Sequence, residues 1–146
     1  IMLSSKNKEK IYIKCIESIR STAESNKLKF ISKLLFESFD SWIFCGFYFQ
    51  DNENLLISEY SAHKIPCSPI GFDGVCGAAI LKNKILNIED INTFQGHIVC
   101  DENSKSELCI PFDFKGKNYV LDVDSSIYNA FCEVDVKYLA KIIKFI

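Results

Sequence analysis

The spacing of apolar residues changes near residue 40, and this change constrains the fold more than any other feature of the chain. Residues 10–23 and the segment 25–39 carry apolar side chains every three or four residues, the spacing of amphipathic helices. Residues 41–49, SWIFCGFYF, are an aromatic-rich run typical of a buried strand. The pattern predicts two helices, the second capped by Ser25, followed by the first strand of a sheet.

Turn residues divide much of the remaining chain into two hairpins. The sequence DNEN at 51–54 is a turn between the aromatic strand and a second strand at 55–62. Lys115-Gly116 is a second turn signal, between predicted strands at 107–114 and 117–125.

The segment between the hairpins is rich in loops. Residues 61–73 contain two prolines and show no period, whereas 74–84 read as a short helix and 85–88 as a short strand. Residues 89–105 form a long polar loop. Because a loop of this length in a small domain is usually functional, we expect part of the site there.

A last helix begins near Glu133 and presents leucine and isoleucine side chains. The whole order predicts one α+β domain, residues 10–146, with helices packed on a central antiparallel sheet. Residues 1–9, with the charged run KNKEK, are predicted to be a flexible N-terminal tail. The apolar helix can cover its own sheet or pack on a second copy of the chain, so a homodimer stays open.

The composition argues against nucleic acids and membranes as partners. The formal net charge is −2, and no basic stripe is interleaved with aromatic residues. No apolar run reaches the roughly 18 to 20 residues that a membrane span needs, and the N-terminus lacks the apolar core of a signal peptide. We therefore expect a soluble, cytoplasmic protein.

Seven cysteines in 146 residues are unusual for a reducing compartment. No CxxC pair occurs, which excludes zinc-ribbon and thioredoxin motifs. Four of the seven read as small buried residues of apolar runs or of the last helix: Cys15, Cys45, Cys109 and Cys132. The other three lie in or beside loops and could be redox-active, unreactive or metal-binding: Cys67, Cys76 and Cys100. Cys76 lies in the first turn of a predicted helix, where the helix dipole favours a thiolate.

Three acidic residues point to a second polar feature. Asp122 and Asp124 are two residues apart on a predicted strand, so both side chains lie on one face. Glu107 begins the neighbouring strand and could share that face. Such a group is either a solvated sheet edge or a pocket that binds an ammonium group and holds a carboxylic acid able to donate a proton.

Several segments, taken together and in order, resemble the free methionine-(R)-sulfoxide reductases, which are single GAF-domain enzymes. They are GVCGAA at 74–79, GHIVCDENSKSE at 96–107, Pro111 and LDVDS at 121–125. The resemblance extends over roughly residues 10–146. It implies a GAF-like fold and the reduction of free methionine-(R)-sulfoxide to methionine.

The resemblance also implies roles for individual residues. Cys100 matches the nucleophile, and Cys67 and Cys76 match two further cysteines, of which at least one resolves the oxidised intermediate. The substrate pocket would be lined by three acids and three rings: Glu107, Asp122, Asp124, Tyr48, Phe44 and Trp42. Phe44 stands where the family has Trp, and Trp42, two residues earlier, is expected on the same strand face. The spacing from Cys67 to Cys76 is one residue shorter than in the family.

The implied chemistry needs no bound metal or organic cofactor. A thiolate can attack the sulfoxide sulfur only if an acid protonates the departing oxygen, and the attacking cysteine becomes a sulfenic acid. A second thiol condenses with it to a disulfide, which thioredoxin, itself reduced by thioredoxin reductase and NADPH, would reduce. Two alternatives are a GAF domain that only binds a small molecule as a sensor, and a zinc site. The zinc ligands would be Cys67, Cys76, His97 and Cys100, whose spacings fit no common ligand pattern.

Overall fold

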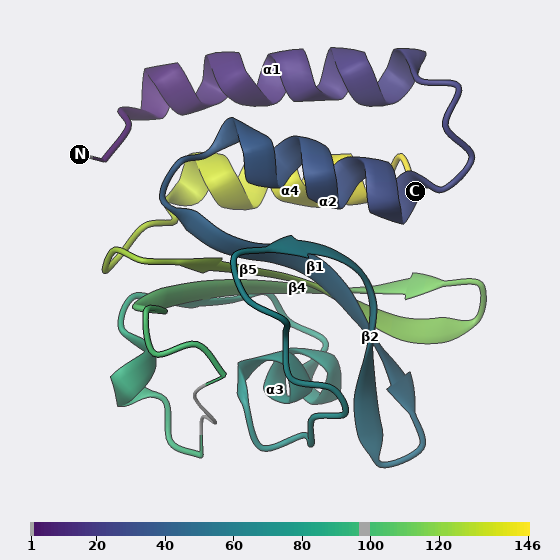
Figure 1. Ribbon diagram of the computed structural model, residues 1–146, viewed down its shortest axis with the longest axis vertical. Helices are drawn as coiled ribbons and strands as arrows, with labels where there is room; N and C mark the ends of the chain where they lie inside the picture. Colours follow the sequence, from purple (N-terminus) through teal and green to yellow (C-terminus); the bar gives the residue numbers. More distant parts are fainter. Residues whose placement is uncertain (1, 97–99) are drawn as a thin grey trace.

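The two faces of one antiparallel sheet carry different layers, as the computed structural model in Figure 1 shows. The structure describes residues 2–96 and 100–146. Within these residues, five strands lie in the order β2-β1-β5-β4-β3. Their bounds are Trp42–Asp51 (β1), Asn54–Ala62 (β2), Leu86–Ile88 (β3), Ser106–Phe114 (β4) and Lys117–Ser125 (β5).

Among the described residues, three α-helices cover one face of the sheet and a fourth lies on the other (Figure 1). The first group is α1 (Ser5–Ser21), α2 (Lys27–Ser38) and α4 (Glu133–Ile143), with α1 packed outside α2 and α4. On the opposite face, α3 (Val75–Lys82) lies beside the loops that connect β2 to β4, including the short 3-10 helix η1 (Ile91–Thr93). The predicted α+β architecture with a central antiparallel sheet is confirmed.

Alternation along β1 separates two apolar clusters. Cys45 and Phe47 are fully buried in the cluster on the side of α1, α2 and α4. Phe44 and Tyr48 belong to the cluster on the side of α3. Because successive residues of a strand point to opposite faces, one aromatic-rich strand supplies rings to both clusters.

The predicted flexible tail is wrong for residues 5–9, which form the first turns of α1. The Ser4 side chain caps this helix by accepting a hydrogen bond from the backbone N–H of Asn7. Lys8 is buried and donates to Asp135 Oδ2 at 2.6 Å and to the carbonyl of Ala130 at 2.7 Å. The charged N-terminal segment is therefore held by partners near the other end of the chain.

Other element boundaries agree closely with the sequence. The second helix begins one residue later than expected, because the Asn26 side chain, not that of Ser25, accepts the capping bond from Lys29 N–H. Both hairpins form as predicted, with β1 paired to β2 and β4 paired to β5. No helix within the described ranges is sufficiently long and apolar to cross a membrane.

Candidate active site

A pocket with a volume of about 80 Å³ opens on the α3 side of the sheet. Strands β1, β4 and β5 and the end of β2 contribute to it, together with helix α3, the loop after β2 and the loop before β4. Its floor holds three acids from β4 and β5, which are Glu107, Asp122 and Asp124. Cys100, from the loop before β4, lines the same pocket.

The pairing register of β4 and β5 explains why the acids gather. Glu107 is directly opposite Asp124, and Cys109 is directly opposite Asp122. Side chains of directly opposite residues lie on one face of the sheet, about 5 Å apart at Cβ. The predicted shared face of the three acids is therefore confirmed, and the face is buried rather than solvated, with Glu107 only 4% and Asp122 only 5% exposed.

Burial and mutual repulsion change the ionisation of this group. Burial raises the pKa of the Glu107 carboxyl well above its usual value, and the charges of Asp122 and Asp124 raise it further. Burial, followed by the charge of Asp122, likewise raises the pKa of Asp124. These two acids therefore keep their protons to a higher pH than free carboxylic acids, as a proton donor at neutral pH requires.

A disulfide joins Cys67 to Cys100, with 5.8 Å between their Cα atoms. Cys100 is exposed and Cys67 is half-buried in the loop that follows β2. The hydroxyl of Tyr48 donates a 2.8 Å hydrogen bond to the carbonyl of Cys67, which ties this loop to β1. Of the two cysteines proposed as partners of Cys100, the structure thus bonds Cys67 to it.

Cys76 has a different environment from the one predicted for it. It lies in the first turn of α3 but is buried, and its Sγ is 3.3 Å from Sγ of Cys109. The hydrogen bond with Cys109 lowers the pKa of the Cys76 thiol, but burial and the charges of Asp122 and Asp124 outweigh it and raise the pKa to about 12. The expectation that the helix start favours a thiolate here is therefore wrong.

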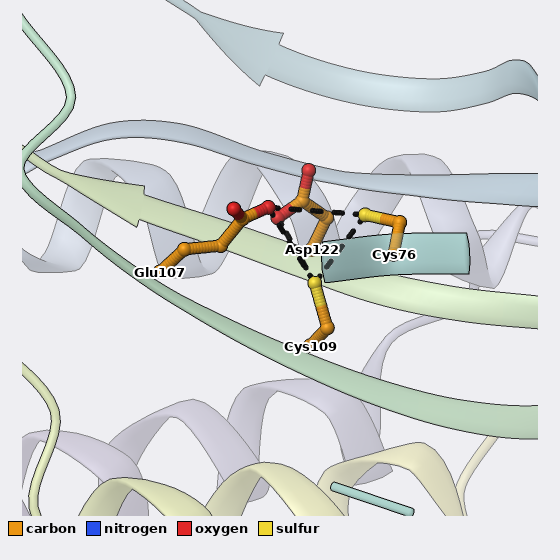
Figure 2. A group of neighbouring side chains, drawn as sticks. All are labelled: Cys76, Glu107, Cys109 and Asp122. Carbon is orange, nitrogen blue, oxygen red and sulfur yellow. Dashed lines mark hydrogen bonds between the residues drawn. The ribbon is translucent and has the colours of Figure 1, made fainter. Parts of the chain in front are cut away.

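Cys109, which the sequence analysis assigned to the apolar core, is a polar neighbour of the acids. It is buried as predicted, but its thiol donates to Glu107 Oε2 and to Asp122 Oδ1, both at 3.5 Å. Figure 2 shows these side chains pointing toward one another. A signal was present in the sequence, because a residue two positions after Glu107 on a strand must share its face.

The aromatic wall of the pocket consists of fewer rings than expected. Phe44 and Tyr48 line the pocket, with their ring centroids 6.1 Å apart. Gly46 leaves room for the first ring, since a Cβ there would lie 2.8 Å from Cζ of Phe44. The placement of Trp42 on the same face is wrong: it packs between Phe39 and Phe131 in the helix-side cluster.

A β-bulge is the reason for the different direction of Trp42. Between Trp42 and Phe44 the register with β5 shifts, so that two steps along β1 oppose the single step from Ser125 to Asp124. An extra residue in one strand reverses the alternation of its side chains at that point. His97, one of the zinc ligands considered from the sequence, lies outside the described residues.

Comparisons with known proteins agree with this arrangement. No family model matches the chain. The free methionine-R-sulfoxide reductase of Escherichia coli is 36% identical over 115 residues, which are 77% of this chain and 68% of the relative. The chain belongs to the free methionine-R-sulfoxide reductase family. GAF domain-containing protein A of Dictyostelium discoideum is 37% identical over an alignment of 149 positions, which covers 97% of this chain and 94% of the relative.

A solved structure of this family shares the fold over nearly the whole chain. The free methionine-R-sulfoxide reductase of Neisseria meningitidis in complex with its substrate has 25% sequence identity and a TM-score of 0.83. The match covers 99% of this chain and 90% of that protein. A solved GAF domain also matches, with 28% identity and a TM-score of 0.84, which confirms the GAF-like fold expected from the sequence.

The raised pKa of Glu107 predicts a measurable effect on stability. The pKa of this carboxyl is higher in the folded state than its value of 4.5 in the unfolded chain, so its contribution to stability is complete only when the pH is below 4.5. This stabilisation is lost as the pH rises through the folded pKa. Glu107→Gln removes the buried charge, so we expect its free energy of unfolding to exceed that of the parent increasingly from pH 5 to pH 8.

The gain is expected to grow with pH, because the parent must ionise a buried carboxyl and the variant need not. Urea unfolding at a series of pH values measures it. Glu53→Gln, at an exposed turn residue between β1 and β2, is the control and should show no such pH trend. Parallel stability curves for Glu107→Gln and the parent would show that the carboxyl carries no buried charge.

Proposed function

We propose that this protein reduces free methionine-(R)-sulfoxide to methionine, with Cys100 as the nucleophile. The observation that carries the proposal is a cysteine pair, Cys67 and Cys100, at a pocket whose floor holds buried carboxyl groups. A disulfide alone is common in redox proteins, and an acid cluster alone has many uses. Their combination supplies the two groups that sulfoxide reduction requires, a nucleophilic sulfur and a proton donor.

In the first step, the Cys100 thiolate attacks the sulfoxide sulfur. This attack forms a bond between the two sulfurs, while the sulfoxide oxygen takes a proton from Glu107 or Asp124, the acids with raised pKa values. The protonated oxygen then passes to the Cys100 sulfur, so the substrate S–O bond and the bond between the two sulfurs break as the new S–O bond forms. Methionine leaves, and Cys100 carries the oxygen as a sulfenic acid. The substrate sulfur has gained two electrons, and the cysteine sulfur has lost them.

In the second step, the Cys67 thiol attacks the sulfenic sulfur and water leaves. The product is the Cys67–Cys100 disulfide, whose sulfurs the structure already joins. Cys76 is a less suitable resolving residue, because its thiol has a pKa of about 12 and contacts Cys109 instead. A dithiol protein of the thioredoxin type then reduces the bridge, which is accessible to it because Cys100 is exposed.

The remaining pocket groups fit the two ends of the substrate. Asp124 Oδ1 is buried, and none of the residues that the structure describes donates a hydrogen bond to it, so it can accept one from the substrate ammonium group. Phe44 and Tyr48 offer ring surfaces to the methylsulfinyl end. A sulfur–aromatic contact contributes about 0.3 to 1.5 kcal/mol, which favours this orientation over the reverse one.

A coupled assay with thioredoxin, thioredoxin reductase and NADPH tests the proposal. We expect NADPH consumption with free methionine-(R)-sulfoxide and less than about one-tenth of that rate with the (S) epimer. N-acetylated methionine sulfoxide is a second control, because it lacks the ammonium group that the acids would bind. If methionine is not formed from the (R) epimer even with dithiothreitol as reductant, the protein is not this enzyme, and the result favours a GAF domain that only binds a small molecule. A homodimer stays a prediction.

A further inference from the structure

Four potential metal ligands converge on the floor of the pocket, in the group that Figure 2 draws. Each offers one ligand atom, and these atoms all lie within 4.8 Å of one another. All four residues are buried. We refer to them as the thiol–acid cluster: Cys76, Glu107, Cys109 and Asp122.

We propose that the thiol–acid cluster binds one Zn²⁺ ion or a similar thiophilic divalent cation. This cluster shares only Cys76 with the zinc site considered from the sequence. Two other ligands of that site, Cys67 and Cys100, form the disulfide in the structure. It also takes in Cys109, for which the reduction of the sulfoxide has no use. The argument depends on the spacing of the ligand atoms, their chemistry and their surroundings.

The spacing of the ligand atoms matches a tetrahedral zinc site. With Zn–S bonds of about 2.3 Å and Zn–O bonds of about 2.0 Å, tetrahedral geometry puts two sulfurs about 3.7 Å apart and a sulfur and an oxygen about 3.5 Å apart. The two sulfurs are 3.3 Å apart. The sulfur–oxygen distances are 3.5 Å from Cys109 to each acid and 3.8 Å from Cys76 to Glu107. An ion can enter the centre with shifts of a few tenths of an ångström.

The donor types select among metal ions. Two sulfurs with two carboxylate oxygens suit zinc and other thiophilic ions. Mg²⁺ and Ca²⁺ prefer six or more oxygen ligands, which the cluster does not offer. The pocket opening gives an ion access to the cluster, because Cys76, Glu107 and Asp122 line it.

The surroundings also favour a cation. Asp124 lines the same pocket and adds a further carboxyl beside the cluster. Lys64, which also lines the pocket, is paired with Asp101 at 3.7 Å and its side chain is 51% exposed. A dication would offset the repulsion among these groups.

Metal binding would inhibit the reductase reaction. The ion would hold Glu107, one of the two proposed proton donors, and would put a positive charge where the substrate ammonium group is expected. The inhibition rests on the proposed function, whereas the binding does not. Zinc would therefore act as a reversible inhibitor that competes with the substrate.

The binding test uses the protein with the Cys67–Cys100 disulfide formed, so that these two sulfurs cannot ligate. Cd²⁺ is titrated into this form, and the ultraviolet absorption of cadmium–thiolate bonds is recorded together with the heat of Zn²⁺ binding. We expect saturation at one ion per chain, with no competition from an excess of Mg²⁺. Failure to observe a saturable thiolate absorption in the parent protein overturns the proposal.

Two cysteine variants locate the site. Cys109→Ala removes one ligand, and even the loss of an indirect partner lowers metal affinity about 10- to 100-fold, so we expect at least about a 100-fold loss. Cys45→Ala is the matched control: Cys45 is a free, fully buried strand cysteine on the opposite face, and its loss should leave the affinity unchanged. Cys109→Ser replaces the alanine variant if that protein does not fold. Equal affinities of the Cys109 and Cys45 variants also overturn the proposal.

The activity readout separates this inference from the proposed function. Zn²⁺ should inhibit the parent and Cys45→Ala equally, and half-inhibition of Cys109→Ala should need at least about 100 times more zinc. A protein that binds Cd²⁺ but never forms methionine keeps the metal site and loses the proposed function. A protein that forms methionine but binds no thiophilic ion keeps the proposed function and loses the metal site.

Discussion

Cys100→Ser is expected to abolish methionine formation, with a fall of roughly 1,000-fold or more in the rate of a single turnover. The reason is that a serine hydroxyl is far less acidic and less nucleophilic than a thiol, so no sulfur can attack the substrate. Free methionine released after one addition of methionine-(R)-sulfoxide, without any reductant, measures the effect. The control is Cys132→Ser, because Cys132 is a half-buried free cysteine at the start of α4 and should be replaceable without loss.

Cys67→Ser separates the attacking sulfur from the resolving one. Because Cys100 is intact, we expect about one methionine per chain in the absence of reductant, followed by arrest with Cys100 as a sulfenic acid that a sulfenic-acid reagent labels. Peptide mass mapping of the parent after the same treatment should find the Cys67–Cys100 bridge. Methionine release by Cys100→Ser at the parent rate would instead assign the attack to another sulfur.

Most of the fold could be predicted because its elements have strong local signals. The change of hydrophobic period located the first strand, and turn residues located both hairpins to within a residue or two. The segment expected at 117–125 is the observed β5. These features depend on propensities and turn chemistry, which act over a few neighbouring residues.

The two errors in the fold depend on interactions that local patterns do not contain. Lys8 and Asp135 are 127 positions apart, so nothing near the N-terminus indicates that residues 5–9 are helical and held. The bulge beside Trp42 inserts a residue into a run that is apolar on both faces. In such a run the side-chain alternation gives no sign of the shift.

The acid cluster could be predicted because spacing by two on a strand fixes a shared face. The same rule, applied from Glu107, would have placed Cys109 with the acids, but its apolar neighbours in LCIPF favoured a core assignment. The choice between Cys67 and Cys76 could not be made from spacing. It depends on loop paths, and in the structure the loop after β2 is held by Tyr48 and carries Cys67 to Cys100.

Asp135→Ala is expected to cost about 3–5 kcal/mol of stability, the usual cost of leaving a buried charge without its partner. Asp135 is fully buried and accepts hydrogen bonds from Lys8 Nζ and from the hydroxyl of Tyr12, both at 2.6 Å. It also accepts a 2.8 Å bond from the backbone N–H of Cys132 at the start of α4. The substitution therefore leaves a buried lysine and a buried tyrosine without this partner, and it removes one of the two hydrogen bonds of the capping box at the start of α4.

Urea unfolding at pH 7 measures this loss, and the surface ion pair provides the comparison. Lys64→Ala breaks the pair with Asp101, whose lysine side chain is 51% exposed, and should cost less than about 1 kcal/mol. A loss below about 1 kcal/mol for Asp135→Ala as well would contradict the buried network. Because α1 and α4 pack on the face opposite the pocket, the folded variant should retain the methionine-forming activity at temperatures well below its unfolding transition. The Lys8–Asp135 network thus stabilises the fold from the face opposite the pocket, and its loss is expected to change stability without changing the chemistry.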